Sequence, residues 1–340
     1  MSAPLGLRRT SRIRLVAAAR HDLLPTLTTC FRRRQHTGLA APSSSTTGSV
    51  NEDEIAHFSR LSSRWWDEHG EFGLLHKMNP HRVDFIREKL LEITREERGE
   101  EAAEEMQRTG HVLEGLDVLD VGCGGGLLSE SLARLGGRTV GIDASPSNIA
   151  IASMHASADP ALCSSKTRSL TYRHTSAEAL LEDPQRYDVV CSLEVVEHVD
   201  NPASFLHSCA QLVKPGGHLF LSTIARTPLS YFLTIFMAEQ ALRLVTPGTH
   251  THSKYINPEE LVEYFQNYPS SDFPGERKGR PWISRLYDGH PLRTEAEVRG
   301  IIYAPWKGEW ILIPRSGSRG FSGWATTQCN YLFWVRKPVQ

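Results

Sequence analysis

The stretch Leu116-Asp117-Val118-Leu119-Asp120-Val121-Gly122-Cys123-Gly124-Gly125-Gly126 decides the fold of this 340-residue chain. Its first six residues are mostly apolar and predict a buried strand, and the glycines after them predict a tight turn. Residues 127–135 then predict a helix, and residues 138–143 predict a second strand. Glycines in front of a helix let backbone N–H groups come close to a ligand, because no Cβ stands in the way. The stretch therefore predicts a strand, a turn and a helix built around a nucleotide-type ligand.

An acidic residue at the end of the second predicted strand narrows the choice of ligand. Asp143 lies 21 residues after Gly122, where a carboxylate can accept hydrogen bonds from both hydroxyls of a ribose. The dinucleotide fingerprint G-x-G-x-x-G would start at Gly122 and Gly124, but its third glycine falls on Leu127. The pattern favours an adenosine-type cofactor without a diphosphate.

Strands and helices are predicted to alternate along the following residues. We expect strands over residues 170–174, 187–192 and 218–223, and helices over residues 147–157, 177–181 and 202–213. Such alternation predicts an α/β fold with a doubly wound, parallel sheet. The candidates for the last, antiparallel strands are residues 301–303, 310–313 and 328–335.

The composition is that of a globular protein with a full core, since 40% of the residues are hydrophobic and 23% are charged. Six cysteines are scattered without a C-x-x-C pair, which argues against a disulfide framework or a zinc site. No run reaches the roughly 20 apolar residues that a membrane-spanning helix needs. The net charge of −1 gives no overall preference for a polyanionic partner.

The first fifty residues differ from the rest of the chain. They contain eight arginines, no lysine, many serines and threonines, and Asp22 as the single acid. We interpret residues 1–50 as a mitochondrial transit peptide and linker, because this composition is typical of such segments. The alternative is a disordered basic arm that binds nucleic acid. Without this segment 30 basic and 38 acidic residues remain, a charge of −8, so we expect no nucleic-acid binding by the body of the protein.

Residues 51–340 are expected to form one domain. Asn51 followed by Glu54 predicts a helix N-cap with a capping box, and aromatic residues at helical spacing follow. The Glu-rich residues 94–108 predict a solvated insertion, either helical or disordered. The expected parts are N-terminal helices that form a lid (51–91), a cofactor-binding core (115–225), a membrane-facing helix (227–246) and a loop-rich insertion (268–325).

Three side chains suited to acid–base or metal chemistry follow the fourth predicted strand. Glu194, Glu197 and His198 have i, i+3, i+4 spacing, which on a short helix places two carboxylates and an imidazole on one face. They also lie at the carboxyl edge of the sheet, where open α/β sheets bind ligands. A divalent ion on oxygen ligands lowers the pKa of a bound phenol, and a histidine can act as base. The alternative is a solvated helix start with acids near its positive end.

One apolar segment is predicted to face a membrane. Residues 228–245 read PLSYFLTIFMAEQALRLV, with Glu239 and Arg243 near the end. The segment is too short and too charged to span a bilayer, but it suits an amphipathic helix that lies in the membrane interface. The alternative is a buried helix that covers the site.

In combination, these motifs resemble a known enzyme family. Residues 120–126, 141–143 and 212–217 are together similar to the class I S-adenosylmethionine-dependent methyltransferases. Residues 64–72, 75–82, 194–199 and 248–250 narrow the resemblance to the mitochondrial branch of the ubiquinone-biosynthesis O-methyltransferases, from about residue 51 to residue 264. The resemblance implies a doubly wound, mostly parallel, seven-stranded Rossmann-like methyltransferase sheet with N-terminal helices.

The resemblance also implies a reaction and its site residues. S-adenosylmethionine is the expected methyl donor, and the expected acceptors are the catechol-type hydroxyls of 3,4-dihydroxy-5-polyprenylbenzoate and demethylubiquinol. The cofactor positions of the family fall on Arg82, Gly122, Asp143 and Leu193. The resemblance implies Mg²⁺ on Glu194, Glu197 and His198. From the chemistry alone, His198 is the first candidate for a catalytic base, and His250 and His252 are weaker candidates that we expect to be structural.

The same resemblance implies a place in the cell, namely the matrix side of the mitochondrial inner membrane, peripherally bound and within a multi-enzyme ubiquinone-synthesis complex. Two other functions stay open on the sequence. One is a class I methyltransferase with another small-molecule acceptor, and the other is a mainly structural member of such a complex. A further alternative is an α/β domain whose glycine turn binds no ligand.

Overall fold

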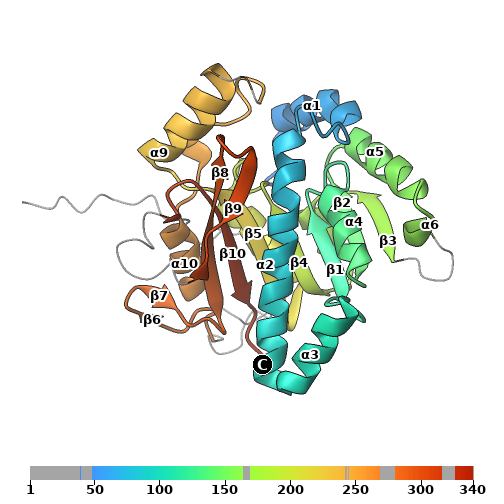
Figure 1. The fold of residues 1–340 in the computed structure, drawn as a ribbon, viewed down its shortest axis with the longest axis vertical. Helices are drawn as coiled ribbons and strands as arrows, with labels where there is room; N and C mark the ends of the chain where they lie inside the picture. The colour runs from blue at the N-terminus through green and yellow to red at the C-terminus, as the bar shows by residue number, and fades with distance from the viewer. Residues whose placement is uncertain are drawn as a thin grey trace, which may run out of the picture. The chain divides into compact units, whose positions relative to one another are not determined.

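A computed structural model describes residue 39 and residues 48–163, 169–241, 243, 245–268, 280–315 and 326–339 (Figure 1). The predicted transit peptide therefore lies almost entirely outside the described residues. All elements below belong to one compact unit of residues 37–340.

The centre of the molecule is an eight-stranded sheet in the order β3-β2-β1-β4-β5-β10-β8-β9 (Figure 1). The five strands from β3 to β5 are parallel, and β10, β8 and β9 are antiparallel additions. Their bounds are β1 Asp117–Val121, β2 Arg138–Asp143, β3 Leu170–His174, β4 Tyr187–Leu193, β5 Val213–Ile224, β8 Ala296–Ala304, β9 Glu309–Leu312 and β10 Asn330–Arg336. The mostly parallel, doubly wound fold is confirmed, with β9 at the edge as one strand more than the seven expected.

Side chains that alternate along the strands build two hydrophobic cores, one on each face of the sheet. In β5, Leu219 and Leu221 belong to one core and Phe220 to the other. The first core is covered by α8 (Pro202–Leu212) and α10 (Pro258–Asn267), and the second by α2 (Gly73–Arg98) and α4 (Leu127–Arg134). Burial on both faces explains why the central strands read as nearly continuous apolar runs.

The remaining helices are 3 to 12 residues long. They are α1 (Glu52–Leu61), η1 (Ser62–Arg64), α3 (Glu100–Thr109), α5 (Pro146–Ser157), α6 (Pro160–Cys163), α7 (Ala177–Leu180), α9 (Pro228–Ser230), η2 (Tyr231–Ala241) and η3 (His252–Lys254). Asn51 caps α1 by accepting a hydrogen bond from the backbone N–H of Glu54, as expected. The Glu-rich residues 94–108, expected to be either helical or disordered, are helical and belong to the end of α2 and to α3.

The segment predicted to be loop-rich contains more regular structure than expected. It holds β8, β9 and a small hairpin of β6 (Leu286–Tyr287) and β7 (His290–Pro291), whereas residues 269–279 and 316–325 lie outside the described part. Glu297 and Arg299 obscured the strand signal of β8, because a buried strand with charged side chains does not read as apolar. Both side chains are buried and ion-paired.

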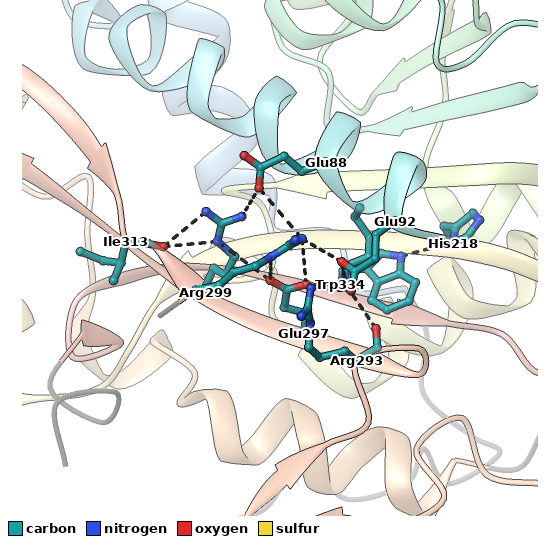
Figure 2. Close-up of polar contacts among 10 residues, drawn as sticks. Glu88, Glu92, His218, Arg293, Glu297, Arg299, Ile313 and Trp334 are labelled. Carbon is teal, nitrogen blue, oxygen red and sulfur yellow. Dashed lines mark hydrogen bonds and ion pairs between the residues drawn. The ribbon is translucent and has the colours of Figure 1, made fainter. Parts of the chain in front are cut away.

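A cluster of charged side chains joins α2 to β8 and β10 (Figure 2). Lys89 of α2 is fully buried, donates to Glu92 at 3.0 Å and to the backbone oxygen of Arg293 at 3.2 Å, and also pairs with Glu297. Its ammonium lies 4.5 Å from the centre of the Trp334 ring. Because a buried charge is stable only when it is paired, this cluster fixes the long helix α2 against the antiparallel part of the sheet.

Candidate active site

The glycine turn connects β1 to α4 and lies at the carboxyl edge of the sheet. Gly122, Gly124 and Gly126 have positive φ angles of 74°, 53° and 90°, a conformation that strains other residues. A Cβ on Gly122 would lie 2.5 Å from Val195 Cγ2, so the turn has no room for a side chain. The expected turn is confirmed, and its backbone borders a cavity of about 430 Å³.

Asp143 ends β2 beside this turn, as expected. Its Oδ2 accepts a hydrogen bond from the Gly124 N–H at 2.9 Å, and its Oδ1 accepts from Ser145 N at 2.8 Å and from Asn148 Nδ2 at 3.2 Å. Burial raises the pKa of Asp143 although these hydrogen bonds act against the shift. The carboxylate is thus held at the wall of the cavity. Oδ1 already accepts from two donors, and Oδ2, with one donor, keeps a lone pair for a ligand hydroxyl.

Two tryptophans from the N-terminal helices cover the glycine turn. The ring of Trp65 packs on Gly124 and Gly125 and stacks on Phe72 with ring centres 3.9 Å apart. The indole N–H of Trp66 donates to the Gly125 carbonyl at 3.0 Å. These contacts give the pair a packing role over the glycine turn.

Arg82 of α2 is a buried cation in the wall of the same cavity. Its Nη2 lies 3.6 Å from Glu194 Oε1, and within the described residues its Nε and Nη2 have no hydrogen-bond partner. Burial lowers the pKa of Arg82, against the attraction of Glu194 and two further acids. Open donors on a buried guanidinium fit an anionic ligand group such as the carboxylate of an amino-acid moiety.

The predicted short helix after β4 is wrong. Glu194 has a φ of 59°, and residues 195–198 form a turn, because a residue in the left-handed region cannot continue a right-handed helix. The turn nevertheless brings Leu193, Glu194, Glu197 and His198 to the same cavity.

Each of the three polar residues in this turn has a partner from another element. Glu194 Oε1 accepts from the Ser222 hydroxyl at 2.6 Å, and Glu197 Oε2 accepts from the Thr223 hydroxyl at 2.9 Å. Burial, reinforced by the carboxylate of Glu194, raises the pKa of Glu197 to about 7. The charge of Glu194 thus disfavours ionisation of Glu197.

His198 is bound by Glu54, a residue that the sequence assigned only to a capping box. His198 Nδ1 lies 3.1 Å from Glu54 Oε2, and Phe58 packs edge-on against the imidazole at 5.1 Å. Burial acts to lower the pKa of His198, but Glu54 and Glu197 outweigh it and raise the pKa. No local pattern indicates this contact, because 144 residues separate Glu54 and His198.

The expected magnesium ligands do not form a ready metal site. Within the described residues no group of three or more His, Cys, Asp or Glu side chains is arranged to hold a metal ion. The hydroxyls of Ser222 and Thr223 hold the two carboxylates. The chemistry of the donors still fits a hard divalent cation, since two carboxylates and an imidazole line the same cavity and such a cation prefers oxygen ligands.

Comparisons with known proteins show which family this chain resembles. A family model described as a methyltransferase domain matches residues 86–268. A protein of Schizosaccharomyces pombe named ubiquinone biosynthesis O-methyltransferase, mitochondrial, is 38% identical over 291 residues, which cover 86% of this chain and 88% of that protein. A protein of Arabidopsis thaliana with the same name is 39% identical over 270 residues, covering 79% and 72%. The similar protein of Leptothrix cholodnii, named ubiquinone biosynthesis O-methyltransferase, is 44% identical over 212 residues, covering 62% and 79%.

Among solved structures, a magnesium protoporphyrin IX methyltransferase from Synechocystis with bound S-adenosylhomocysteine matches with a TM-score of 0.46 and 16% identity, covering 84% of this chain and 100% of that one.

The fold, the glycine turn and the methyltransferase-domain match define a class I S-adenosylmethionine-dependent methyltransferase. The shared length and identity narrow this class to one family, because the chain is 38% identical to its fission yeast relative and covers 88% of it. This chain belongs to the ubiquinone biosynthesis O-methyltransferase family. The names of the relatives from fission yeast, Arabidopsis and rat also support a mitochondrial location.

Proposed function

We propose that the chain transfers the methyl group of S-adenosylmethionine to catechol-type hydroxyls of polyprenylated ubiquinone precursors, namely 3,4-dihydroxy-5-polyprenylbenzoate and demethylubiquinol. One observation carries this proposal. A single cavity is lined by the glycine turn and Asp143 at one wall, by Glu194, Glu197 and His198 at another, and by apolar side chains of η2. Cofactor, catechol and the start of a lipid tail therefore share one space.

In this proposal the cofactor is bound by four residues. Gly122 admits the cofactor to the backbone of the turn, Asp143 accepts the ribose hydroxyls, and Arg82 binds the methionine carboxylate through its open donors. Leu193, at the end of β4, supplies an apolar wall. The charge of Arg82 and the open lone pair on Asp143 Oδ2 are complementary to the two polar ends of the cofactor.

The acceptor has to lose a proton before it can attack, because a phenol has a pKa near ~10. Glu194, Glu197 and His198 are proposed to bind the catechol oxygens, with His198 as the first candidate for the base. We also propose that these three side chains hold Mg²⁺, which when bound would lower the pKa of the catechol. With the ion bound, the carboxylates of Glu194 and Glu197 would either give up their hydrogen bonds from the Ser222 and Thr223 hydroxyls or keep them beside the ion.

Membrane association belongs to the same proposal. Leu229, Tyr231, Phe232 and Phe236 of α9 and η2 are each more than two-fifths exposed, whereas Glu239 is buried. The helix thus turns apolar side chains outward and its acid inward, the reverse of an ordinary surface helix. No helix in the described part of the chain is long and apolar enough to cross a bilayer. We propose peripheral binding to the matrix side of the inner membrane, as part of a ubiquinone-synthesis complex.

Expression in a fission yeast strain that lacks its own relative tests the assigned pathway. The chain is expected to restore ubiquinone and to remove the unmethylated catechol precursors, both measured by mass spectrometry of lipid extracts. The Asp143→Ala variant is the matched control and is expected to restore neither, because it loses the ribose acceptor. Restoration by both proteins would show that cofactor binding does not need Asp143, and restoration by neither would favour another acceptor or the mainly structural role.

A further inference from the structure

A carboxylate buried on η2 organises the turn that carries His250. Glu239 Oε2 accepts from the Gly248 N–H at 2.8 Å, and Glu239 Oε1 accepts from the His250 N–H at 2.8 Å. The same Oε1 lies 2.7 Å from His250 Nδ1. Burial acts to raise the pKa of Glu239, but the hydrogen bonds from His250 and Gly248 outweigh it and lower the pKa. The carboxylate is therefore ionised and acts as an acceptor only.

This carboxylate fixes the tautomer of His250. Because Glu239 can only accept, the proton of a neutral His250 sits on Nδ1, and the lone pair sits on Nε2. Among the described residues Nε2 has no hydrogen-bond partner, and His250 lines the cavity.

Neighbouring elements hold the ring and its turn in place. Tyr255 packs edge-on against the imidazole with ring centres 6.2 Å apart, and its hydroxyl lies 2.7 Å from the Thr234 hydroxyl of η2. Glu71 accepts from the Thr246 N–H at 2.6 Å and anchors the start of the same turn. Glu239, Tyr255 and Glu71 are the titratable groups that these contacts bring to the turn.

We infer that His250 Nε2 accepts the proton of the catechol during methyl transfer and that Glu239 is the residue that positions it. This inference rests on the proposed function. The catechol O–H bond breaks and its proton passes to Nε2. The oxygen lone pair forms the new bond to the methyl carbon, and the C–S bond breaks with its electron pair going to sulfur. The positive charge of the sulfonium is thereby replaced by that of the imidazolium, which the Glu239 carboxylate stabilises.

Two other histidines line the cavity, but neither pairs with a buried carboxylate. His57 has a buried Nε2 without a partner in the described residues, and no carboxylate contact is found for its ring. His198 also has a carboxylate on Nδ1, but this carboxylate is Glu54, whose side chain is 23% exposed, whereas that of Glu239 is 3% exposed. In the proposed function His198 is the first candidate for the base and is also one of the three residues that hold Mg²⁺. An imidazole nitrogen bound to a metal ion cannot take up a proton, so the inference moves the role of base to His250. His250 is the cavity histidine that combines a buried carboxylate on one ring nitrogen with an open second nitrogen.

The test compares two acceptors that differ in acidity, using the full chain. Unsubstituted catechol needs a base at neutral pH, whereas 4-nitrocatechol is much more acidic and largely supplies its own anion. For His250→Gln we expect kcat with catechol to fall by about 10²- to 10⁴-fold, the usual range for a lost general base. With 4-nitrocatechol the loss is expected to shrink to within about fivefold. Glu239→Gln should show a smaller loss with the same recovery, and Glu239→Asp should retain more activity than Glu239→Gln.

Matched controls separate this role from a structural one. His252→Gln makes the same chemical change two residues away, at a histidine that contacts the Thr227 carbonyl and does not line the cavity, and it should show no acceptor-dependent loss. Binding of S-adenosylhomocysteine, followed by calorimetry, reports whether each variant is folded. An equal loss of activity with both acceptors, or no loss, would overturn the inference, and so would recovery by 4-nitrocatechol in His198→Gln but not in His250→Gln. A wild-type protein that methylates both small catechols but not the prenylated acceptor would contradict the proposed function alone.

Discussion

Two separate features require a glycine at position 124, namely the backbone conformation of the turn and the ring of Trp65 that packs on it. The φ of 53° at Gly124 is in the left-handed region, and a Cβ at this position would overlap the ring of Trp65. The glycine pattern of the sequence predicted the turn, because the backbone conformation of a turn depends mainly on the residues within it. The overlap with Trp65 was not predictable, because it depends on a residue 59 positions earlier in the chain.

Substitution of Gly124 by alanine is expected to displace Trp65 and to weaken S-adenosylhomocysteine binding at least about tenfold, or ~1.4 kcal/mol. Gly308→Ala is the matched control, because Gly308 has a φ of 71° but no atom within 4 Å of the added Cβ. It should carry a similar backbone strain of about 1 kcal/mol with unchanged cofactor binding. Calorimetric titration checks both. Equal affinities for the two variants would show that the contact with Trp65 is unimportant.

His218 gives a prediction for stability against pH. Burial, with smaller contributions from the charges of Arg336 and Lys89, lowers the pKa of His218 to about 3, and its Nδ1 accepts from the indole N–H of Trp334 at 3.3 Å (Figure 2). The unfolded chain has a histidine pKa near ~6.5, so it binds a proton below that pH while the folded state does not. Stability should therefore fall as the pH drops from about 6.5 toward 3, by at most ~1.4 kcal/mol per pH unit from this group.

Urea unfolding between pH 5 and pH 7 measures this dependence. In His218→Asn the amide oxygen can still accept from Trp334, but no proton is taken up. The variant should lose part of the pH dependence of the wild type. Identical slopes in the two proteins would contradict the assignment to His218.

At the scale of elements, the parallel strands of the sheet were predictable from the sequence. The strand β8 and the turn at Glu194, which depend on contacts with other parts of the chain, were not fully predictable. The strands of the core carry short apolar runs separated by helices, a signal that is local. The strand β8 was only partly predicted, because Glu297 and Arg299 find ion-pair partners on α2 and elsewhere. The turn at Glu194 was predicted as a helix from its i, i+3, i+4 spacing, which is equally compatible with one face of a turn.

The helix formed by α9 and η2 is the element whose exposure makes the clearest prediction. Leu229 and Phe236 are 44% and 46% exposed, and neither lines the cavity. Replacing both by serine should weaken binding to liposomes at least about tenfold, because each apolar side chain contributes roughly 1.5–3 kcal/mol when fully buried. Sedimentation with vesicles that contain anionic lipid measures the binding.

Tyr287→Ser is the matched control at an equally exposed ring on β6, and it should bind like the wild type. Equal binding of the double variant would show that another surface meets the membrane.

At the scale of the whole molecule, the site is assembled from elements far apart in the chain. Arg82 comes from α2, the glycine turn follows β1, Asp143 ends β2, and Glu194 follows β4. The sequence predicted the last three of these positions together because the ends of parallel strands meet at one edge, whereas Arg82 was expected from the family resemblance alone. It did not predict the partners Glu54 and Glu239, which reach His198 and His250 only through the packing of helices on the sheet.

The central claim is that this cavity transfers a methyl group to a lipid catechol. The most direct measurement is the incorporation of label from S-adenosylmethionine into a short-tailed 3,4-dihydroxy-5-prenylbenzoate by the purified chain, with Mg²⁺. We expect one methyl group on a ring hydroxyl, and we expect its loss in the presence of a chelator and in Glu194→Ala. Activity that survives complete chelation would contradict the proposed metal. No incorporation by a protein that still binds S-adenosylhomocysteine would contradict the claim itself.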